Sequence, residues 1–295
     1  MPDKIVVILN PHAGSTHPGG IRDQLPGLFA AHDLAPAFHL LEPGEHAADV
    51  ARKAVGEGCR IVVAAGGDGT IGAAASAVAG SEAVLGVLPM GTLNHFAKDL
   101  GIPIDLPGAV AVIARGRAIP IDIAEVNGHI FINNSSLGIY PDIVIVRERQ
   151  RRRGRAKWLA FAQATLQVLH RSPFLKVRVS ADAEGGVYET PFVFVGNNEY
   201  RMEGLEIGTR TSIDRGRLFV YVAAPISRGG LVWMALTALF RHLDSERKLS
   251  IFCVEDTWIE TRRRHVRVST DGEVRRLTAP LHYRIIPGAL RVLAP

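Results

Sequence analysis

In the N-terminal part of the chain, up to about Ile123, continuous apolar runs alternate with segments of helical spacing. An apolar run of strand length predicts a strand buried on both faces, and apolar residues at every third or fourth position predict a helix. The expected strands are 5–9, 37–41, 61–65 and 83–89, and the expected helices are 22–32, 45–56 and 71–79. Buried strands separated by helices predict a parallel sheet that is covered on both faces.

Beyond Ile123 the pattern changes to short strands, some of which alternate between polar and apolar residues, as in 176–180 and 265–269. The expected strands are 130–133, 176–180, 187–196, 218–223, 248–254, 257–262, 266–269 and 281–286, and the expected helices are 156–170 and 230–243. Many short strands bounded by turns predict an antiparallel β domain, most simply a sandwich. The sequence therefore predicts an α/β domain followed by an all-β domain.

Composition agrees with two globular domains, because the 295 residues are 47% apolar and 21% charged. The two cysteines, Cys59 and Cys253, stand in apolar surroundings, which predicts buried thiols in a reducing compartment. The N-terminal apolar run is too short for a signal peptide, and the apolar stretch 231–240 is too short to span a bilayer. We therefore expect a cytoplasmic protein whose contact with the inner face of the membrane, if any, is peripheral.

The net charge of +5 is unevenly distributed. Seven Lys or Arg residues lie between Arg147 and Lys157, opposed only by Glu148, and a second basic cluster spans 262–267. Such clusters attract phosphates, nucleic acid or anionic lipid headgroups, although a single run can also be an ordinary solvated face. No nucleic-acid-reading motif accompanies them, so we expect no nucleic-acid partner. A peripheral membrane contact through the Arg147–Lys157 segment is the alternative to a solvated helix start.

A glycine-rich segment follows the expected buried strand 61–65 and precedes a helix. Its residues are Gly66, Gly67, Asp68, Gly69 and Thr70. Ligands of open α/β sheets bind at the carboxyl ends of the strands, and glycines there let the backbone approach a phosphate closely. The segment matches neither the Walker A motif nor the Rossmann fingerprint. It predicts a phosphate-binding turn, with a tight structural turn as the alternative.

Two further loops follow expected strands of the same sheet. One begins at Asn10, and the other, 89–97, contains Gly91, Thr92 and Asn94. Because the carboxyl ends of parallel strands lie at one edge of a sheet, the three loops should converge. Convergence of three such loops predicts a nucleotide site.

These three loops resemble the nucleotide site of the diacylglycerol kinase catalytic-domain family, which includes bacterial lipid kinases and sphingosine and ceramide kinases. The likeness extends through most of the chain: 131–138 resembles the first strand of the family's second domain, 268–273 its late Asp-Gly-Glu motif and 287–290 its closing strand. The glycine segment alone would also fit NAD kinases and phosphofructokinases.

The resemblance implies a nucleotide-binding α/β domain over 1–124, to which 287–295 returns, and a β-sandwich domain over 125–286, with the active site in the cleft between them. It implies a cytoplasmic transferase of lipid metabolism and phospholipid biosynthesis that uses ATP and Mg²⁺. The acceptor would be a hydroxyl of diacylglycerol or a similar lipid at a membrane surface. The oligomeric state stays open.

The resemblance also implies roles for individual residues. The expected nucleotide-binding residues are Asn10, Gly66, Gly67, Asp68, Gly69, Thr70, Gly91, Thr92 and Asn94. Asp68 would act through magnesium or bridging water, and Asp271 would be the base that accepts the hydroxyl proton. Glu273 would be its competitor or its metal-binding companion. From the residues alone, Asp271-Gly272 predicts only a hairpin turn.

Two departures from the family pattern limit this transfer of roles. Many bacterial members hold a structural magnesium with an Asp-Asp-Gly turn, where this chain has Asp214-Arg215-Gly216. A cation beside Arg215 would be repelled, so we expect that site not to be used. Leu41 stands where the family tends to place a threonine near the adenine or ribose. The alternatives are a non-catalytic nucleotide- or lipid-binding member of the fold and a kinase of a soluble substrate, similar to NAD kinase.

Overall fold

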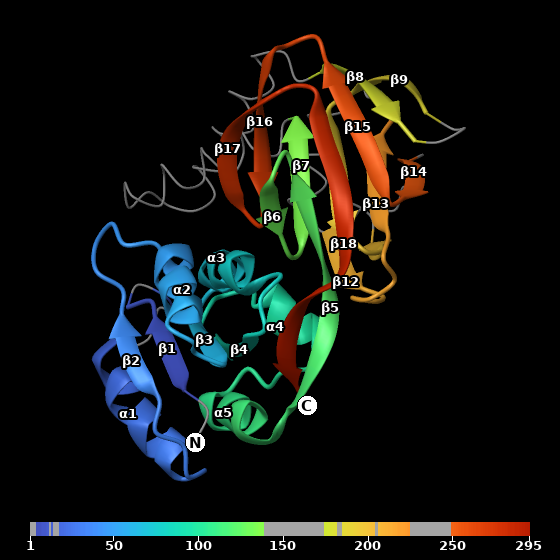
Figure 1. The fold of residues 1–295 in the computed structure, drawn as a ribbon. Coiled ribbons are helices and arrows are strands. Elements are labelled where there is room, and N and C mark those ends of the chain that lie inside the picture. Colours follow the sequence, from blue (N-terminus) through green and yellow to red (C-terminus); the bar gives the residue numbers. More distant parts are fainter. Residues whose placement is uncertain are drawn as a thin grey trace, which may run out of the picture. The chain divides into compact units, whose positions relative to one another are not determined.

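A computed structural model describes residues 4–11, 13, 18–138, 174–181, 185–203, 206–224 and 249–295. The chain divides into two compact units (Figure 1). Unit 1 comprises Met1–Ile123, Ser212–Gly216 and Ile286–Pro295, and unit 2 comprises Ala124–Thr211 and Arg217–Ile285. Two long strands, β5 (Arg117–Val126) and β18 (Leu281–Ala294), run from one unit into the other.

Unit 1 is built on four parallel strands in the order β2-β1-β3-β4. The strands are β1 (Ile5–Leu9), β2 (Ala37–Leu40), β3 (Ile61–Gly66) and β4 (Val84–Pro89), and the last part of β18 lies beside β4. The helices are α1 (Pro18–Ala30), α2 (Ala47–Gly56), α3 (Asp68–Val78), α4 (His95–Asp99) and α5 (Leu106–Arg115). Helix α2 packs against α3 and α1 against α5, on the two faces of the sheet (Figure 1). This confirms the predicted parallel sheet with helices on both faces.

The composition of these elements explains their packing. Strand β3 is central, and its residues from Val62 to Ala65 are completely buried, so an uninterrupted apolar run suits it. Helix α3 buries Ile71, Ala74, Ala75 and Val78, which recur at helical spacing, and its small alanines allow it to lie close to the sheet. The result is a rigid edge from which the loops after β1, β3 and β4 emerge.

Unit 2 contains a six-stranded antiparallel sheet in the order β14-β13-β10-β7-β16-β17. Its strands are β7 (Asn134–Gly138), β10 (Phe192–Asn197), β13 (Leu218–Ala223), β14 (Leu249–Val254), β16 (His265–Thr270) and β17 (Glu273–Thr278). The facing strands are β8 (Leu175–Ser180), β9 (Gly186–Thr190), β15 (Asp256–Thr261) and the first part of β18. Short strands β6 (His129–Phe131), β11 (Tyr200–Glu203) and β12 (Glu206–Arg210) complete the described part.

The two layers of unit 2 enclose one apolar core. Leu137, Val220 and Val268 contribute to it from the six-stranded sheet, and Ile259 and Tyr283 from the facing strands. Alternation places these residues inward. On the other side of β10 and β13, Phe194 and Tyr221 form a second buried cluster with Tyr200. The predicted antiparallel sandwich is therefore confirmed.

Several local predictions differ from the structure. The expected strand 187–196 is two strands, β9 and β10, separated at Pro191, which lacks the N–H that a continuous ladder needs. Strand β18 is much longer than expected, and α5, β5 and β17 were not predicted. The prediction that Cys253 is buried is wrong: its neighbours Phe252 and Val254 point into the core, so Cys253 faces outward and is exposed.

Other predictions fall on residues that the structure does not describe. These are the helices 156–170 and 230–243 and the basic segment from Arg147 to Lys157. In the described residues, no helix has the length and apolar character needed to cross a membrane.

Candidate functional site

In unit 1, the predicted nucleotide loops meet at one edge of the sheet. Asn10 follows β1, Gly67 follows β3 and Met90 follows β4, and all three strands are parallel. Backbone hydrogen bonds extend the ladder into the loops, because Asn10 N–H donates to the Ala65 carbonyl at 3.0 Å and Met90 N–H donates to the Gly66 carbonyl at 2.8 Å. The three loops therefore start from fixed positions.

The side chains of Asn10 and Thr70 link the first loop to the glycine segment. Asn10 Nδ2 donates to Thr70 Oγ1 at 2.8 Å, so the threonine hydroxyl keeps its own hydrogen for another acceptor. Gly66 is required beside them, because a Cβ there would lie 2.6 Å from Thr70 Cβ. The glycine thus lets Thr70 fold back over the strand end and present its hydroxyl beside the first turn of α3.

The start of α3 has the geometry of an anion-binding turn. Gly67 is its N-cap in an extended conformation, and no side chain caps the helix. The N–H groups of the first turn lack partners within the helix, and the helix dipole adds partial positive charge there. Asp68 lies in this first turn, and its Oδ1 accepts from Phe96 N–H at 3.3 Å.

The loop after β4 packs directly on the glycine segment. A Cβ on Gly91 would lie 2.7 Å from Gly67 Cα, so only glycine permits this backbone approach. Asn94 adopts a left-handed conformation with φ 51°, is 3% exposed, and holds Gly91 through both its amide oxygen and its amide nitrogen, at 2.8 and 3.0 Å. Its side chain therefore fixes the loop, whereas Thr92 is exposed.

The chemistry around Asp68 fits a magnesium ion bound mainly through phosphates and water. The described residues contain no group of three or more acidic, His or Cys side chains able to hold a metal. Mg²⁺ commonly keeps several waters and uses one or two carboxylates together with substrate phosphates. A single carboxylate in the first turn of α3 suits that arrangement.

In unit 2, Asp271 lies in the turn of the β16–β17 hairpin. Asp271 and Gly272 both have positive φ, 49° and 84°, which is the geometry that an Asp-Gly pair favours in a two-residue hairpin loop. The turn directs the Asp271 carboxylate at the segment between β6 and β7. Its Oδ2 accepts from Ile132 N–H at 2.8 Å, and its Oδ1 accepts from Asn133 and Asn134 N–H at 2.8 and 3.2 Å.

Burial raises the pKa of the Asp271 carboxyl from 3.8 to about 6. The three N–H donors and the positive charge of Arg210 act in the opposite direction, because they favour the ionised form. Near pH 7 the group is ionised and is a stronger base than an ordinary aspartate. A carboxylate offers about four lone-pair sites, so the three donors leave one on Oδ2 able to accept a proton.

A buried polar network surrounds this segment, and it was not predicted from the sequence. Arg210, which is 8% exposed, donates from Nη1 to the Ile132 carbonyl at 2.7 Å and from Nη2 to Asn133 Oδ1 at 3.3 Å. Asn197 donates from Nδ2 to the same Ile132 carbonyl at 2.8 Å. The sequence did contain one signal for this network, the pair Asn197 and Asn198 at the end of an apolar strand. Buried side-chain amides need hydrogen-bond partners within the protein.

Glu273 is differently placed, although it is only two residues from Asp271. It is exposed, and its Oε2 accepts from Arg275 Nη2 at 2.7 Å. The Glu273 carboxylate, which was expected to assist the base or to bind a metal, is thus hydrogen-bonded to the Arg275 guanidinium. Both roles stay predictions for Glu273.

The expectation that no metal is used at the Asp214 turn stays a prediction. Asp214 and Arg215 are exposed, and Asp214 Oδ1 accepts from Ser212 Oγ at 2.9 Å. The turn also contacts Asp122, which is 2% exposed and accepts from the N–H groups of Gly216 at 2.6 Å and Gly288 at 2.9 Å. A buried carboxylate that bonds to backbone N–H groups therefore helps to hold this turn.

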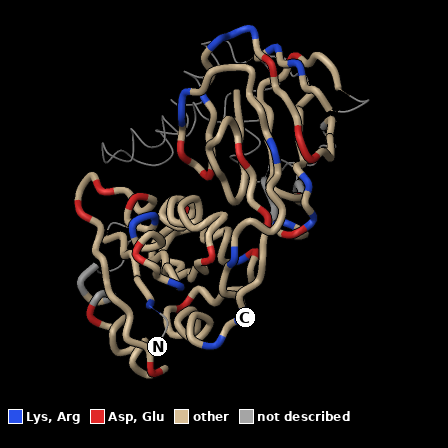
Figure 2. Tube along the Cα trace, viewed as in Figure 1, with Lys and Arg blue, Asp and Glu red and all other residues tan. Residues whose placement is uncertain are grey.

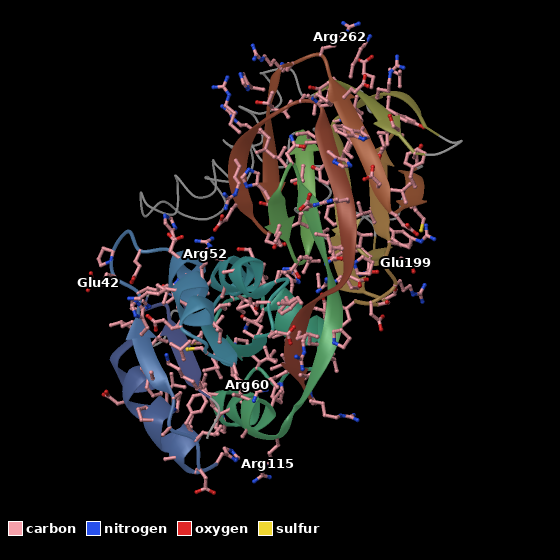
Figure 3. The ribbon with its side chains drawn as sticks, in the orientation of Figure 1. Glu42, Arg52, Arg60, Arg115, Glu199 and Arg262 are labelled. Atoms are coloured by element: carbon pink, nitrogen blue, oxygen red, sulfur yellow. The ribbon has the colours of Figure 1, made fainter. Side chains whose placement is uncertain are left out.

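Three consecutive arginines mark one end of unit 2. Basic residues gather at the turn between β15 and β16, which carries Arg262 to Arg264 (Figure 2). Figure 3 labels Arg262 at this end and Glu199, which follows β10, toward the other. Because β16 runs away from the arginine turn to reach Asp271, the basic turn and the Asp271 hairpin lie at opposite ends of that strand.

Comparison with known proteins agrees with this architecture. Residues 4–126 match the diacylglycerol kinase catalytic domain, and residues 139–294 match the YegS C-terminal NAD kinase beta sandwich-like domain. A protein of Cronobacter sakazakii named "Probable lipid kinase YegS-like" is 28% identical over 260 residues, which cover 84% of this chain and 83% of that protein. A Klebsiella pneumoniae protein of the same name is 50% identical over 80 residues, 26% of this chain and 27% of that one.

Solved structures share the fold. A diacylglycerol kinase from Bacillus anthracis str. Sterne aligns with a TM-score of 0.72 at 20% identity, covering 99% of this chain and 97% of that chain. Yeast NADH kinase in complex with NADH aligns with a TM-score of 0.57 at 14% identity, covering 100% and 84% of the two chains. The sequence matches identify a kinase family, which implies the use of ATP. The chain belongs to the lipid kinase family that joins a diacylglycerol kinase catalytic domain to a YegS C-terminal domain.

Proposed function

We propose that this protein is an ATP-dependent lipid kinase that transfers the γ-phosphoryl group to a hydroxyl of diacylglycerol or a similar lipid. The observation that carries the proposal is the Asp271 carboxylate, which three backbone N–H groups orient and which keeps one lone-pair site for a proton. A half-buried carboxylate of raised pKa suits general-base work on an alcohol. Family membership supports a lipid as the carrier of that alcohol.

The loops of unit 1 would bind the nucleotide. The first turn of α3 and the Thr70 hydroxyl offer hydrogen-bond donors to phosphate oxygens, and Asn10 orients that hydroxyl. The absence of a Cβ lets a phosphate come close to the backbone at Gly66, Gly67 and Gly91. Two further residues of these loops, Gly69 and Thr92, are exposed. Asn94 supports this surface through Gly91.

The proposed chemical step is an in-line phosphoryl transfer from the nucleotide to the lipid alcohol. The acceptor hydroxyl oxygen forms a bond to the γ-phosphorus, the bond between that phosphorus and the bridging oxygen breaks, and ADP leaves with the electron pair. The hydroxyl proton passes to Asp271 Oδ2. Positioning and charge neutralisation dominate such transfers. Magnesium held by Asp68, water and the phosphates would supply the neutralising charge.

The acceptor would be met at a membrane surface. The segment from Arg147 to Lys157 carries seven basic residues and one acidic residue, and juxtamembrane basic residues each contribute about 1 kcal/mol of attraction to an anionic surface. We propose that it provides a peripheral contact with anionic lipid. Binding to vesicles that contain phosphatidylglycerol, but not to vesicles of phosphatidylcholine alone, is the expected result.

One assay separates this function from its alternatives. The protein is incubated with γ-labelled ATP, Mg²⁺ and mixed micelles of dioleoylglycerol, sphingosine or phosphatidylglycerol, with NAD as a soluble acceptor in a parallel reaction. A labelled lipid product supports the proposal. Label on NAD alone would favour the soluble-substrate kinase, for which the fold of yeast NADH kinase is a precedent. Nucleotide binding without any labelled product would favour a non-catalytic member.

A further inference from the structure

A single peptide group of unit 2 lies between the half-buried Asp271 carboxylate and the buried Arg210 guanidinium. The group joins Ile132 to Asn133, and its N–H donates to Asp271 Oδ1 at 2.8 Å. Its carbonyl accepts from Arg210 Nη1 at 2.7 Å and from Asn197 Nδ2 at 2.8 Å. In a trans peptide the N–H and C=O point in opposite directions, so the anion and the cation lie at opposite ends of one aligned dipole.

Arg210 is itself held firmly. Its guanidinium carbon lies 6.0 Å from the centre of the Tyr200 ring. Tyr200 is 7% exposed, and its backbone N–H and carbonyl both bond to the Tyr221 hydroxyl, at 3.0 and 3.1 Å. A second guanidinium nitrogen reaches Asn133 Oδ1, so the fork grips two consecutive residues of the same segment.

Burying Arg210 has a cost that its contacts must offset. A buried guanidinium is expensive to desolvate, and replacing it with an apolar side chain would often be neutral or stabilising. Here its bonds go to the segment that supplies all three N–H donors of Asp271. In a site of low dielectric, hydrogen bonds arranged in series polarise and strengthen one another.

We propose that Arg210 is a positioning residue, which fixes the orientation of the Asp271 carboxylate by gripping the Ile132–Asn133 segment from its carbonyl side. The inference rests on the proposed function, in which Asp271 accepts the acceptor proton. Without Arg210, the segment loses its charged anchor and the three N–H groups lose their fixed direction. Misplacement of a reacting group by about 1 Å can cost on the order of 10²-fold in rate.

The side chain must be arginine for a geometric reason. A guanidinium presents a planar fork of donors, which can serve the Ile132 carbonyl and Asn133 Oδ1 together. An ammonium in the Arg210→Lys variant keeps the charge but is a compact point donor. We therefore expect the lysine variant to lie between the wild type and Arg210→Ala.

The test compares Arg210→Ala, Arg210→Lys, Asp271→Asn and the double variant Arg210→Ala/Asp271→Asn. Arg178→Ala is the matched control, because Arg178 is an exposed arginine of the same unit whose Nε lies 3.8 Å from Glu260. kcat and KM for ATP are measured with the lipid that the wild type phosphorylates, starting with dioleoylglycerol. Thermal midpoints and the amide ¹⁵N–¹H resonances of Ile132 and Asn133 are recorded for each variant.

We expect Arg210→Ala to lower kcat about 10- to 100-fold, with KM for ATP unchanged and both amide resonances shifted. Arg178→Ala should change none of these. The double variant should be no slower than Asp271→Asn, because two residues that act through one group are not additive. If Arg210→Ala does not fold, Arg210→Lys and its double variant with Asp271→Asn carry the same comparison.

Different outcomes would overturn the positioning role of Arg210 and the proposed role of Asp271. An unchanged kcat or unshifted amides in Arg210→Ala, with a lowered kcat in Asp271→Asn, would overturn the positioning role alone. A double variant that is slower by the full Arg210→Ala factor would do the same, because it would show an effect on general stability. Wild-type activity of Asp271→Asn would overturn the role of Asp271 and the inference with it.

Discussion

The glycine loops of unit 1 and the Asp271 centre of unit 2 arrange charge in opposite ways. At the loops, the backbone provides most of the donors, Asn94 shapes the backbone, and Thr70 adds one hydroxyl donor. At the centre, the Asp271 side chain carries the charge, and the backbone N–H groups of 132–134 all donate hydrogen bonds to it. The first arrangement leaves donors for an incoming anion, and the second fixes an anion that is already part of the protein.

This difference suits the two partners of a phosphoryl transfer. A nucleotide brings several negative charges, which unsatisfied N–H groups and a helix dipole can bind. An alcohol brings a proton that must be removed, and this needs a carboxylate of raised pKa in a defined orientation. The comparison predicts that substitutions at the loops weaken nucleotide binding, whereas substitutions at the Asp271 centre slow the chemical step.

The largest expected effect is that of Asp271→Asn. General-base catalysis contributes about 10²- to 10⁴-fold, and we expect kcat to fall within that range with KM for ATP unchanged. Glu273→Gln is the matched control, since it changes a neighbouring carboxylate that is exposed and paired with Arg275. Steady-state kinetics with labelled ATP decides the outcome. A larger loss of kcat in Glu273→Gln than in Asp271→Asn would make Glu273 the base and Asp271 its companion.

The next effect is that of Gly91→Ala. A methyl group there would lie 2.7 Å from Gly67 Cα and 2.8 Å from Asn94 Oδ1, so the two loops must separate. We expect kcat/KM for ATP to fall roughly 10- to 100-fold, mainly through KM, because a small displacement of binding groups has effects of this order. Gly27→Ala in α1 is the control, since its Cβ would meet nothing and the substitution should stabilise the helix by about 0.5–1 kcal/mol. A loss confined to kcat would contradict the proposed division of roles.

The sequence predicted the loops of unit 1 well because their geometry is local. Apolar runs fix the strands, the strand ends fix the loops, and glycines mark close approaches, as at Gly66 and Gly91. The links between loops, such as Asn10 to Thr70, required only that the strands be parallel.

The centre of unit 2 was less predictable because it depends on pairing between distant segments. From residue types alone, Asp271-Gly272 predicts a hairpin turn, and the structure contains that turn. Its contact with 132–134 follows from the register of β7 with β16, in which Ser136 pairs with Ser269. Antiparallel pairing of distant strands leaves no local signal, so Arg210 was not predicted. The division of 187–196 into two strands did have a local signal, Pro191, which the strand prediction overlooked.

The effect of pH on kcat is expected to be smaller than the effects of these substitutions, and to arise from the Asp271 carboxyl alone. This carboxyl has a pKa of about 6, raised from 3.8 by burial. The base works only when ionised, so kcat at pH 5 should be about tenfold below its plateau above pH 7. The residual activity of Asp271→Asn should lack this step. A profile without a step between pH 5 and 7 would contradict the assignment.

The same pKa has the opposite effect on stability. A carboxyl whose folded pKa is raised binds its proton more tightly in the folded state, so its contribution is fully present below pH 3.8 and is lost as pH rises through 6. Conditions that activate the base therefore remove some stability from unit 2. The free energy of unfolding of wild type and Asp271→Asn, measured by urea titration at pH 4 and pH 7, should differ in its pH dependence by this contribution.

The smallest expected effect concerns the Asp214 turn, where a carboxylate again binds backbone N–H groups. Asp122 holds Gly216 and Gly288 as Asp271 holds 132–134, so the turn should need no ion. An occupied Mg²⁺ site at 100 times its Kd would add about 2.7 kcal/mol, or roughly 5 °C or more in Tm. We expect EDTA and Mg²⁺ to give the same midpoint for the nucleotide-free protein. Asp122→Asn should lower the midpoint, because a buried N–H left without an acceptor costs about 1–3 kcal/mol. A magnesium-dependent rise in the wild type that disappears in Asp214→Asn would show that an ion organises this turn after all.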